Sequence, residues 1–327
     1  MMKYPIGIQT FSNIIQDGYV YVDKTDMVYS LANSGKIFFL SRPRRFGKSL
    51  LLSTLKSYFL GQKELFRGLK IDSLEKEWNV YPVFHLSFGK GIFSMPYELD
   101  KNLETFVAMG EREYGKDELA TTISERFAAV IKAAHKKTGR RAVVLIDEYD
   151  KPLLDVMDLE IFVEDESGNR RKLENYNREL LKGFYGVFKD ADEDLQFVFL
   201  TGVTKFSQVS VFSGFNQPDD ISLDEKYESL CGITKEELLT VFDKPIHSLA
   251  ANKNKSYEDM VAMLTEKYDG YHFSSKMTGI FNPFSILNCF SKNDMRNYWF
   301  ASGTPGYLVR LLAHGNENIN ELVGKYY

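Results

Sequence analysis

The chain has 327 residues, of which 44% are hydrophobic and 26% charged, and its formal net charge is −4. This composition is typical of a folded globular protein, and the length predicts two domains. Two cysteines, and five histidines without ligand spacing, exclude a disulfide framework and a zinc site, and the acidic balance argues against a chain built mainly for non-specific nucleic-acid binding.

Positive charge is concentrated at the amino-terminal end. Residues 1–70 contain 11 Lys and Arg against 4 Asp and Glu, so the remainder of the chain is strongly acidic. A basic region in an acidic protein favours recognition of a small polyanionic ligand, with a nucleic-acid groove as the alternative. The first residues lack the apolar core of a signal peptide, and no run of about 18 or more uncharged apolar residues predicts a membrane span. We therefore expect a cytoplasmic protein that does not use a membrane.

Strands and helices are predicted to alternate through the first two thirds of the chain. Expected strands are residues 37–40, 83–88, 142–146 and 196–201, and expected helices are residues 26–35, 50–59, 97–110, 117–137 and 173–188. The helix over residues 117–137 rests on an apolar stripe that starts at Leu119. Because each strand is too apolar for a sheet that faces solvent, we predict a doubly wound α/β domain with ligands at the carboxyl ends of its strands.

The segment between the first strand and its following helix matches a phosphate-binding loop. In the pattern G-x-x-x-x-G-K-[ST], Gly47, Lys48 and Ser49 fill the last three positions, and Arg42 stands where the first glycine is usual. We expect the loop N–H groups to face phosphate, Lys48 to reach the terminal phosphates and Ser49 to bind Mg²⁺. The residues expected to contact a nucleotide are Arg42, Pro43, Arg44, Arg45, Phe46, Gly47, Lys48, Ser49 and Leu50.

Arg42 needs a separate explanation, because glycine normally supplies backbone freedom at that position. Pro43 fixes its own φ and favours extended geometry for Arg42, so a stiff Arg-Pro pair can shape the loop. On this hypothesis Arg42→Gly retains nucleotide affinity. A large loss of affinity would indicate that the Arg42 side chain binds phosphate itself.

The third expected strand ends in two acidic residues, as in a Walker B motif. Asp147 is expected to hold Mg²⁺ together with Ser49, and Glu148 is expected to polarise the attacking water. A strand that ends in two acids is common, so the acidic pair by itself does not predict a nucleotide site. The two together predict a nucleotide site.

Other polar residues follow the ends of the third and fourth expected strands. Thr201 is predicted to sense the γ-phosphate or the attacking water, with Thr204 and Lys205 as alternatives. Asp150 and Lys151 come directly after the acidic pair. We expect these two to cap or pair locally instead of taking part in catalysis.

The character of the sequence changes beyond about residue 207, and the predicted boundary divides a P-loop domain, residues 1–232, from a smaller domain, residues 233–327. An edge strand is expected at residues 227–231. The smaller domain is predicted to be mainly helical and to form either a winged helix or a helical lid. Its helices are expected after a capping box at Thr234–Glu237, over residues 260–268, and from Pro283 and Pro305.

Four sequence blocks, residues 21–25 (YVDKT), 40–50 (LSRPRRFGKSL), 144–152 (VLIDEYDKP) and 200–206 (LTGVTKF), resemble those of a known family. This is the predicted AAA-ATPase-like family of anaerobic bacteria, related to the STAND and archaeal-type P-loop ATPases. The resemblance extends over nearly the whole chain. Arginine is usual at the first loop position of that family, which implies that Arg42 does not mark an inactive site.

The resemblance implies an AAA-like P-loop NTPase fold of the ASCE type and ATP or ADP as the nucleotide. We predict a Mg²⁺-dependent ATPase that acts as a nucleotide switch and borrows an arginine finger from an adjacent subunit or a protein partner. A regulatory or partner-docking module with little hydrolysis and a DNA-processing ATPase are the alternatives. Family members often continue into a PD-(D/E)XK nuclease-like domain, and the chain ends about where such a domain would begin, as a short member or a truncated one.

Overall fold

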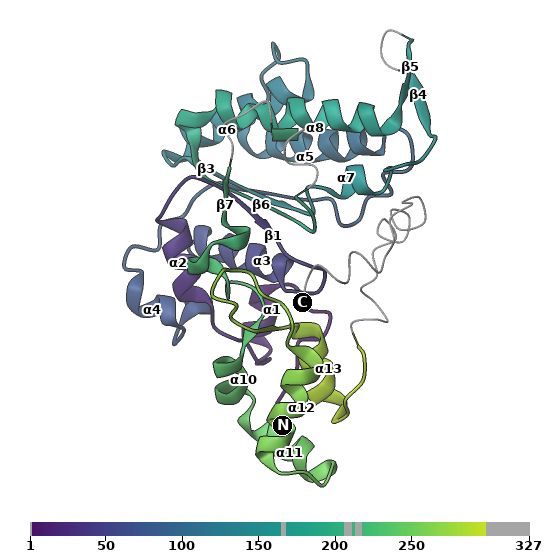
Figure 1. The fold of residues 1–327 in the computed structure, drawn as a ribbon. Coiled ribbons are helices and arrows are strands. Elements are labelled where there is room, and N and C mark those ends of the chain that lie inside the picture. The colour runs from purple at the N-terminus through teal and green to yellow at the C-terminus, as the bar shows by residue number, and fades with distance from the viewer. Residues whose placement is uncertain (1, 165–167, 206–210, 213–217, 299–327) are drawn as a thin grey trace.

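A computed structural model describes residues 2–164, 168–205, 211–212 and 218–298. At its centre lies a sheet of five strands in the order β2-β3-β6-β1-β7 (Figure 1). Every pair of adjacent strands in this sheet is parallel. The strands are β1 (Ile37–Ser41), β2 (Val83–Ser87), β3 (Ala142–Asp147), β6 (Leu195–Gly202) and β7 (Asp219–Asp220). The four predicted strands are confirmed to within one residue at each end.

Strand β6 lies between the strand that precedes the phosphate-binding loop and the strand that ends in the acidic pair. It pairs with β1 through Leu40 and Thr201, and β3 pairs with β2 through Asp147 and Ser87. The carboxyl ends of all three central strands therefore reach one edge of the sheet. This strand order confirms the predicted ASCE-type P-loop fold.

Helices cover both faces of the sheet, as Figure 1 shows. One face is covered by α5 (Glu98–Tyr114), α6 (Ile123–Thr138) and α8 (Leu173–Asp190), and the other by α1 (Phe11–Gln16), α2 (Thr25–Ala32), α3 (Lys48–Phe59) and α4 (Lys70–Leu74). Alternate β3 residues enter the two cores: Val144 faces the α5–α8 side, whereas Val143 and Leu145 face the α3 side. Burial on both faces explains why the strand is continuously apolar.

Shorter elements connect these layers. They are η1 (Lys63–Phe66), α7 (Lys151–Leu154), the antiparallel pair β4 (Phe162–Glu164) and β5 (Arg170–Lys172), η2 (Asp192–Asp194), η4 (Ile221–Leu223) and η5 (Glu225–Tyr227). No helix among the described residues is both long enough and apolar enough to cross a membrane.

The region after Ile233 has a core of its own, in which helices pack around Leu238, Ile246, Leu264 and Ile286. Its elements are β8 (Ile233–Thr234), α10 (Lys235–Val241), α11 (Asp243–Asn252), α12 (Tyr257–Tyr268), β9 (Ile280–Phe281) and α13 (Pro283–Lys292). The structure confirms the capping box and the mainly helical content. In the described part, β8 pairs with the distant β9, so the wing hairpin of a winged helix is not seen there. The helix predicted from Pro305 lies outside the described residues.

One predicted helix starts later than expected, and one predicted strand is wrong. The helix expected from residue 117 begins only at Ile123, because Thr122 and Glu125 form a capping box, and Leu119 is 90% exposed in the preceding turn. The edge strand expected at residues 227–231 is absent, since the segment turns through η5 instead. The backbone carbonyls of Tyr227 and Glu228 accept hydrogen bonds from Arg42, and the short β7 forms the sheet edge.

Candidate functional site

The loop between β1 and α3 is shaped by two residues with positive φ. Gly47 is the N-cap of α3 with φ 91°, a conformation that glycine adopts without the strain a Cβ would impose. Arg45 has φ 67°, which is uncommon for a residue with a side chain. This geometry places Lys48 and Ser49 in the first turn of α3, where free N–H groups and the helix dipole favour an anion.

Lys48 is buried inside the loop. Its Nζ donates hydrogen bonds to the backbone oxygens of Arg42 (2.9 Å) and Pro43 (3.1 Å). Burial lowers the pKa of Lys48, and Asp147 is the strongest of the charges that oppose this effect. The ammonium thus lies at the point to which a phosphate bound by the loop would be drawn.

Asp147 is buried at the end of β3, and a neighbouring strand positions it. The Thr201 hydroxyl on β6 is fully buried and donates a 2.8 Å hydrogen bond to Asp147 Oδ1. A threonine hydroxyl has one proton to donate. In this arrangement Thr201 orients Asp147, and it does not line the cavity beside the loop. The sensor role of Thr201 stays a prediction.

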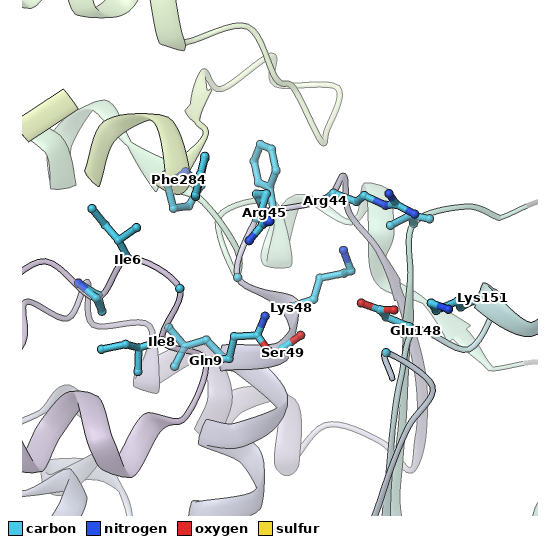
Figure 2. Close-up of a pocket in the computed structure, with 18 of the residues that line it drawn as sticks. Ile6, Ile8, Gln9, Arg44, Arg45, Lys48, Ser49, Glu148, Lys151 and Phe284 are labelled. Carbon is cyan, nitrogen blue, oxygen red and sulfur yellow. The ribbon is translucent and has the colours of Figure 1, made fainter. Parts of the chain in front are cut away.

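Glu148 has φ 56°, so its backbone adopts a left-handed conformation that is unusual for glutamate. Such outliers are concentrated at functional sites because the surrounding fold must enforce them. The half-buried side chain enters the same cavity as Lys48 and Ser49 (Figure 2). Burial raises the pKa of Glu148, with Asp147 adding to the rise and Lys48, Lys151 and Arg44 opposing it.

Asp150 fixes the segment that follows β6. One of its carboxylate oxygens accepts hydrogen bonds from Val203 N (3.0 Å), Thr204 N (2.8 Å) and Thr204 Oγ1 (2.9 Å). Lys151 donates to the Gly91 carbonyl and pairs with Asp155, each at 2.6 Å. The predicted local roles of Asp150 and Lys151 are confirmed, and Thr204 is occupied by Asp150.

The Arg42 side chain points away from the cavity and is 1% exposed. Its Nη1 donates to the carbonyl of Ser222 (2.7 Å), and Nη2 donates to that of Tyr227 (3.2 Å). The guanidinium also lies over the Phe273 ring, 4.0 Å from its centroid. Arg42 therefore joins the loop to the segment after β7, and its side chain is not part of the cavity lining, which agrees with the hypothesis that Arg42 shapes the loop. Contact of Arg42 with a nucleotide stays a prediction.

Aromatic contacts join the loop to the carboxyl-terminal region. The Phe46 ring is buried 4.6 Å from Tyr271 and 5.5 Å from Phe273, measured between ring centroids. Arg45 lies over Phe284, which is in the first turn of α13. No sequence motif predicted this contact between the loop and the carboxyl-terminal region.

A cavity of about 460 Å³ opens beside the loop, within the range of small-molecule sites. Figure 2 shows Ile6, Ile8 and Phe284 at one side of this cavity and Glu148 at the other. The lining residues are Pro5–Gln9, Arg44–Leu50, Gly89, Glu148, Asp150, Lys151, Leu154, Asp155, Val203, Pro283, Phe284 and Leu287. Sequence analysis missed the two apolar segments, since neither residues 5–9 nor residues 283–287 form a motif. Among the expected contacts, Pro43 also lies outside this lining.

Ser49 and Asp147 are the residues placed to hold a divalent cation. Both line a second, polar cavity of about 320 Å³, and Ser49 also lines the first. The described residues contain no group of three or more His, Cys, Asp or Glu side chains that could hold a metal ion. A hydroxyl and one carboxylate fit Mg²⁺, which protein sites often bind through one carboxylate and substrate phosphates.

Comparisons with known proteins show the family of the chain. A family model described as "Predicted AAA-ATPase" matches residues 5–212. A relative from Azotobacter chroococcum mcd 1, described as an uncharacterized protein in the vnfD 5' region, is 40% identical over 314 residues, which are 95% of this chain and 56% of the relative. The chain therefore spans little more than half of that relative's length.

The chain also has a distant similarity to solved structures. The Aeropyrum pernix ORC1 protein in complex with DNA has a TM-score of 0.36 and 10% identity, over 87% of this chain and 65% of that chain.

Proposed function

Because this chain belongs to the predicted AAA-ATPase family, we propose that it binds ATP with Mg²⁺ at the β1–α3 loop, hydrolyses it and acts as a nucleotide switch. The observation that carries the proposal is the meeting of Lys48, Ser49 and Glu148 in one cavity, although the loop and the acid are about 100 residues apart in the chain. A phosphate-binding loop without Glu148 nearby would support nucleotide binding but not hydrolysis.

The residues take distinct roles in this proposal. Lys48 leaves the loop carbonyls and binds the terminal phosphates together with the N–H groups of α3. Ser49 and Asp147 hold Mg²⁺, and Thr201 keeps Asp147 in the orientation that this requires. Glu148 accepts a proton from the attacking water. Mg²⁺, when bound, neutralises the charge that develops on the phosphates.

The other side of the cavity fits a nucleoside. Pro5, Ile6 and Ile8 line this side together with Phe284 and Leu287, so a purine ring can be held against apolar side chains there. The assignment of adenine follows from the family. Because Phe284 and Leu287 belong to α13, the nucleoside would contact the helical region as well as the sheet domain.

These contacts give the switch a physical basis. Phosphate binding acts on the loop, and Phe46 and Arg45 transmit any loop displacement to Tyr271 and Phe284. The helical region would then adopt different positions in the ATP and ADP states. The domain boundary near residue 233 and a cytoplasmic location remain predictions.

The experiment compares ATP hydrolysis by the wild type and by Glu148→Gln at saturating Mg²⁺, with ATP affinity measured in parallel. The proposal expects the substitution to abolish turnover and to leave affinity within about threefold, since Glu148 acts mainly on the transition state. Binding without turnover in the wild type, with or without DNA, would support the regulatory module. Turnover that rises with DNA and falls steeply with salt would support the DNA-processing alternative.

A further inference from the structure

Three cations lie at the Glu148 end of the cavity, and they differ in how they are held. Lys48 is bonded to two loop carbonyls, and Lys151 is bonded to the Gly91 carbonyl and to Asp155. Arg44 lines the same cavity but makes no hydrogen bond or ion pair with the described residues. Its side chain is exposed and its guanidinium is available to a ligand.

The two neighbouring arginines of the loop are directed to opposite ends of the site. Arg45 stacks on Phe284, at the nucleoside end. Arg44 extends towards Glu148 and Lys151 (Figure 2), and its charge acts on the Glu148 carboxyl.

We propose that Arg44 is an arginine finger supplied in cis: its guanidinium binds the γ-phosphoryl oxygens of ATP as charge develops there. The inference rests on the proposed ATPase function and deepens it. It replaces a partner-supplied arginine by one that the loop itself carries. A planar guanidinium with several donors suits two phosphoryl oxygens better than a lysine ammonium does.

The proposed hydrolysis is a displacement at the γ-phosphorus of ATP. The oxygen of water attacks the γ-phosphorus, and the bond from that phosphorus to the β,γ-bridging oxygen breaks. The electron pair of the broken bond remains on the bridging oxygen, which becomes a terminal oxygen of ADP. The water proton passes to the Glu148 carboxylate and the other product is inorganic phosphate. Arg44 forms and breaks no covalent bond, and its N–H groups stabilise the equatorial oxygens.

The test measures single-turnover phosphate release for the wild type, Arg44→Ala and Arg44→Lys, with Arg112→Ala as a matched control. Arg112 is an exposed arginine on α5, outside the cavity. We expect Arg44→Ala to slow hydrolysis by roughly 10³-fold or more, Arg44→Lys to recover part of the rate, and Arg112→Ala to match the wild type. The affinity for ADP should change by about threefold at most, because the effect belongs to the transition state.

A second readout does not depend on turnover. ADP with aluminium fluoride mimics the transition state, so the wild type should hold a fluorescent ADP much more tightly when aluminium fluoride is added. Arg44→Ala should lose this gain and keep its affinity for ADP alone. Equal losses of ADP affinity and hydrolysis, or an unchanged rate, would overturn the catalytic role.

Mixing variants distinguishes cis from trans action. If Arg44 serves the nucleotide of its own chain, a mixture of Arg44→Ala and Glu148→Gln stays inactive, because neither chain has a complete site. Recovery of activity in the mixture would show that Arg44 acts on the nucleotide of a neighbouring subunit and would contradict the proposal.

A wild type that neither hydrolyses ATP nor gains affinity with aluminium fluoride would overturn the ATPase function itself. With a wild type that does both, any failure of the Arg44 variants to lose activity counts against the role of Arg44 alone.

Discussion

Arg42 shows how a loop can replace the usual first glycine with a large charged residue. Its side chain lies in the interior with its charge solvated by carbonyl groups of the segment after β7. A buried guanidinium is tolerated only when such acceptors surround it. At this position the arginine is a structural link between the phosphate-binding loop and the rest of the fold.

Replacing Arg42 should therefore weaken folding more than binding. We expect Arg42→Ala to lower the free energy of unfolding by roughly 2–4 kcal/mol, since it removes charge-assisted hydrogen bonds and leaves buried carbonyls without partners. Urea unfolding measures this loss. The ATP affinity of the folded variant should stay within about threefold of the wild type, because the guanidinium does not line the cavity. Unchanged stability with a large loss of ATP affinity would instead show that the Arg42 side chain binds phosphate.

Thr201 is expected to affect the metal requirement. Thr201→Val removes the hydrogen bond to Asp147 at nearly constant volume, so the concentration of Mg²⁺ needed for half-maximal hydrolysis should rise about tenfold. Thr201→Ser keeps the hydroxyl and should restore the wild-type requirement. A slower rate at saturating Mg²⁺ with no change in this requirement would favour the γ-phosphate sensor role that the sequence predicted.

Residue types near the site were foreseeable, but their partners were not. Gly47, Lys48 and Ser49 are adjacent in the chain, so local spacing revealed them. The contacts of Arg42 with Ser222 and of Thr201 with Asp147 join distant segments. They depend on strand order and register, which short-range patterns do not contain.

At the scale of elements, the boundaries follow local side-chain chemistry. The apolar strands were predicted closely because burial on both faces leaves a continuous signal. The start of α6 was misplaced because Leu119 continues the helical spacing, yet the backbone there is a turn and the capping box of Thr122 and Glu125 starts the helix. The position of the helix start therefore follows the capping residues and not the apolar periodicity.

The same capping box gives a pH-dependent contribution to stability. Hydrogen bonds from the backbone of Thr122 and Thr121 lower the pKa of Glu125 to about 2. A carboxyl whose folded-state pKa is lowered stabilises the fold above its unfolded-state pKa and loses this effect as pH falls towards the folded-state value. The stability difference between the wild type and Glu125→Ala should be largest near pH 7 and shrink progressively below about pH 4.5.

Urea unfolding at several pH values measures this difference. The matched control is Glu266→Ala, which changes an exposed glutamate of α12 that belongs to no capping box. A difference for Glu125→Ala that stays constant down to pH 3 would contradict the capping account.

At the scale of the whole molecule, the amino-terminal segment and the helical region are fastened to each other. Lys24 is 6% exposed and its ammonium lies 2.6 Å from both carboxylate oxygens of Glu237, a residue of the α10 capping box. Burial lowers the pKa of Lys24, and Glu237 opposes this shift. The pair therefore ties the start of the chain to the helices that follow β8.

Breaking this pair on one side should be costly, because the remaining charge is buried without a partner. Glu237→Gln keeps the capping geometry but removes the charge, and we expect it to lower the free energy of unfolding by about 3 kcal/mol. Adding Lys24→Met should recover at least half of this loss. Urea unfolding of the two single variants and the double variant completes the cycle, and strictly additive effects would show that the charges do not interact.

The organisation of the molecule was predictable to the level of its layers. Alternating strands and helices indicated the α/β sheet domain, and capping residues indicated the later helices. The apolar sides of the cavity, formed by residues 5–9 and 283–287, were not predictable, because they meet only after the helical region packs on the loop. The contacts of Phe46 and Arg45 with that region likewise follow from the fold alone.

Phosphate binding by the loop at residues 42–50 can be measured by equilibrium binding of Mg·ATP to the wild type and to Lys48→Met. We expect Lys48→Met to lose affinity by roughly tenfold to hundredfold, which corresponds to one charge-assisted hydrogen bond to phosphate. Lys63→Met, which removes an exposed lysine of η1 outside the cavity, should bind like the wild type. Equal affinity in the wild type and Lys48→Met would show that the loop does not bind the phosphates of ATP through Lys48.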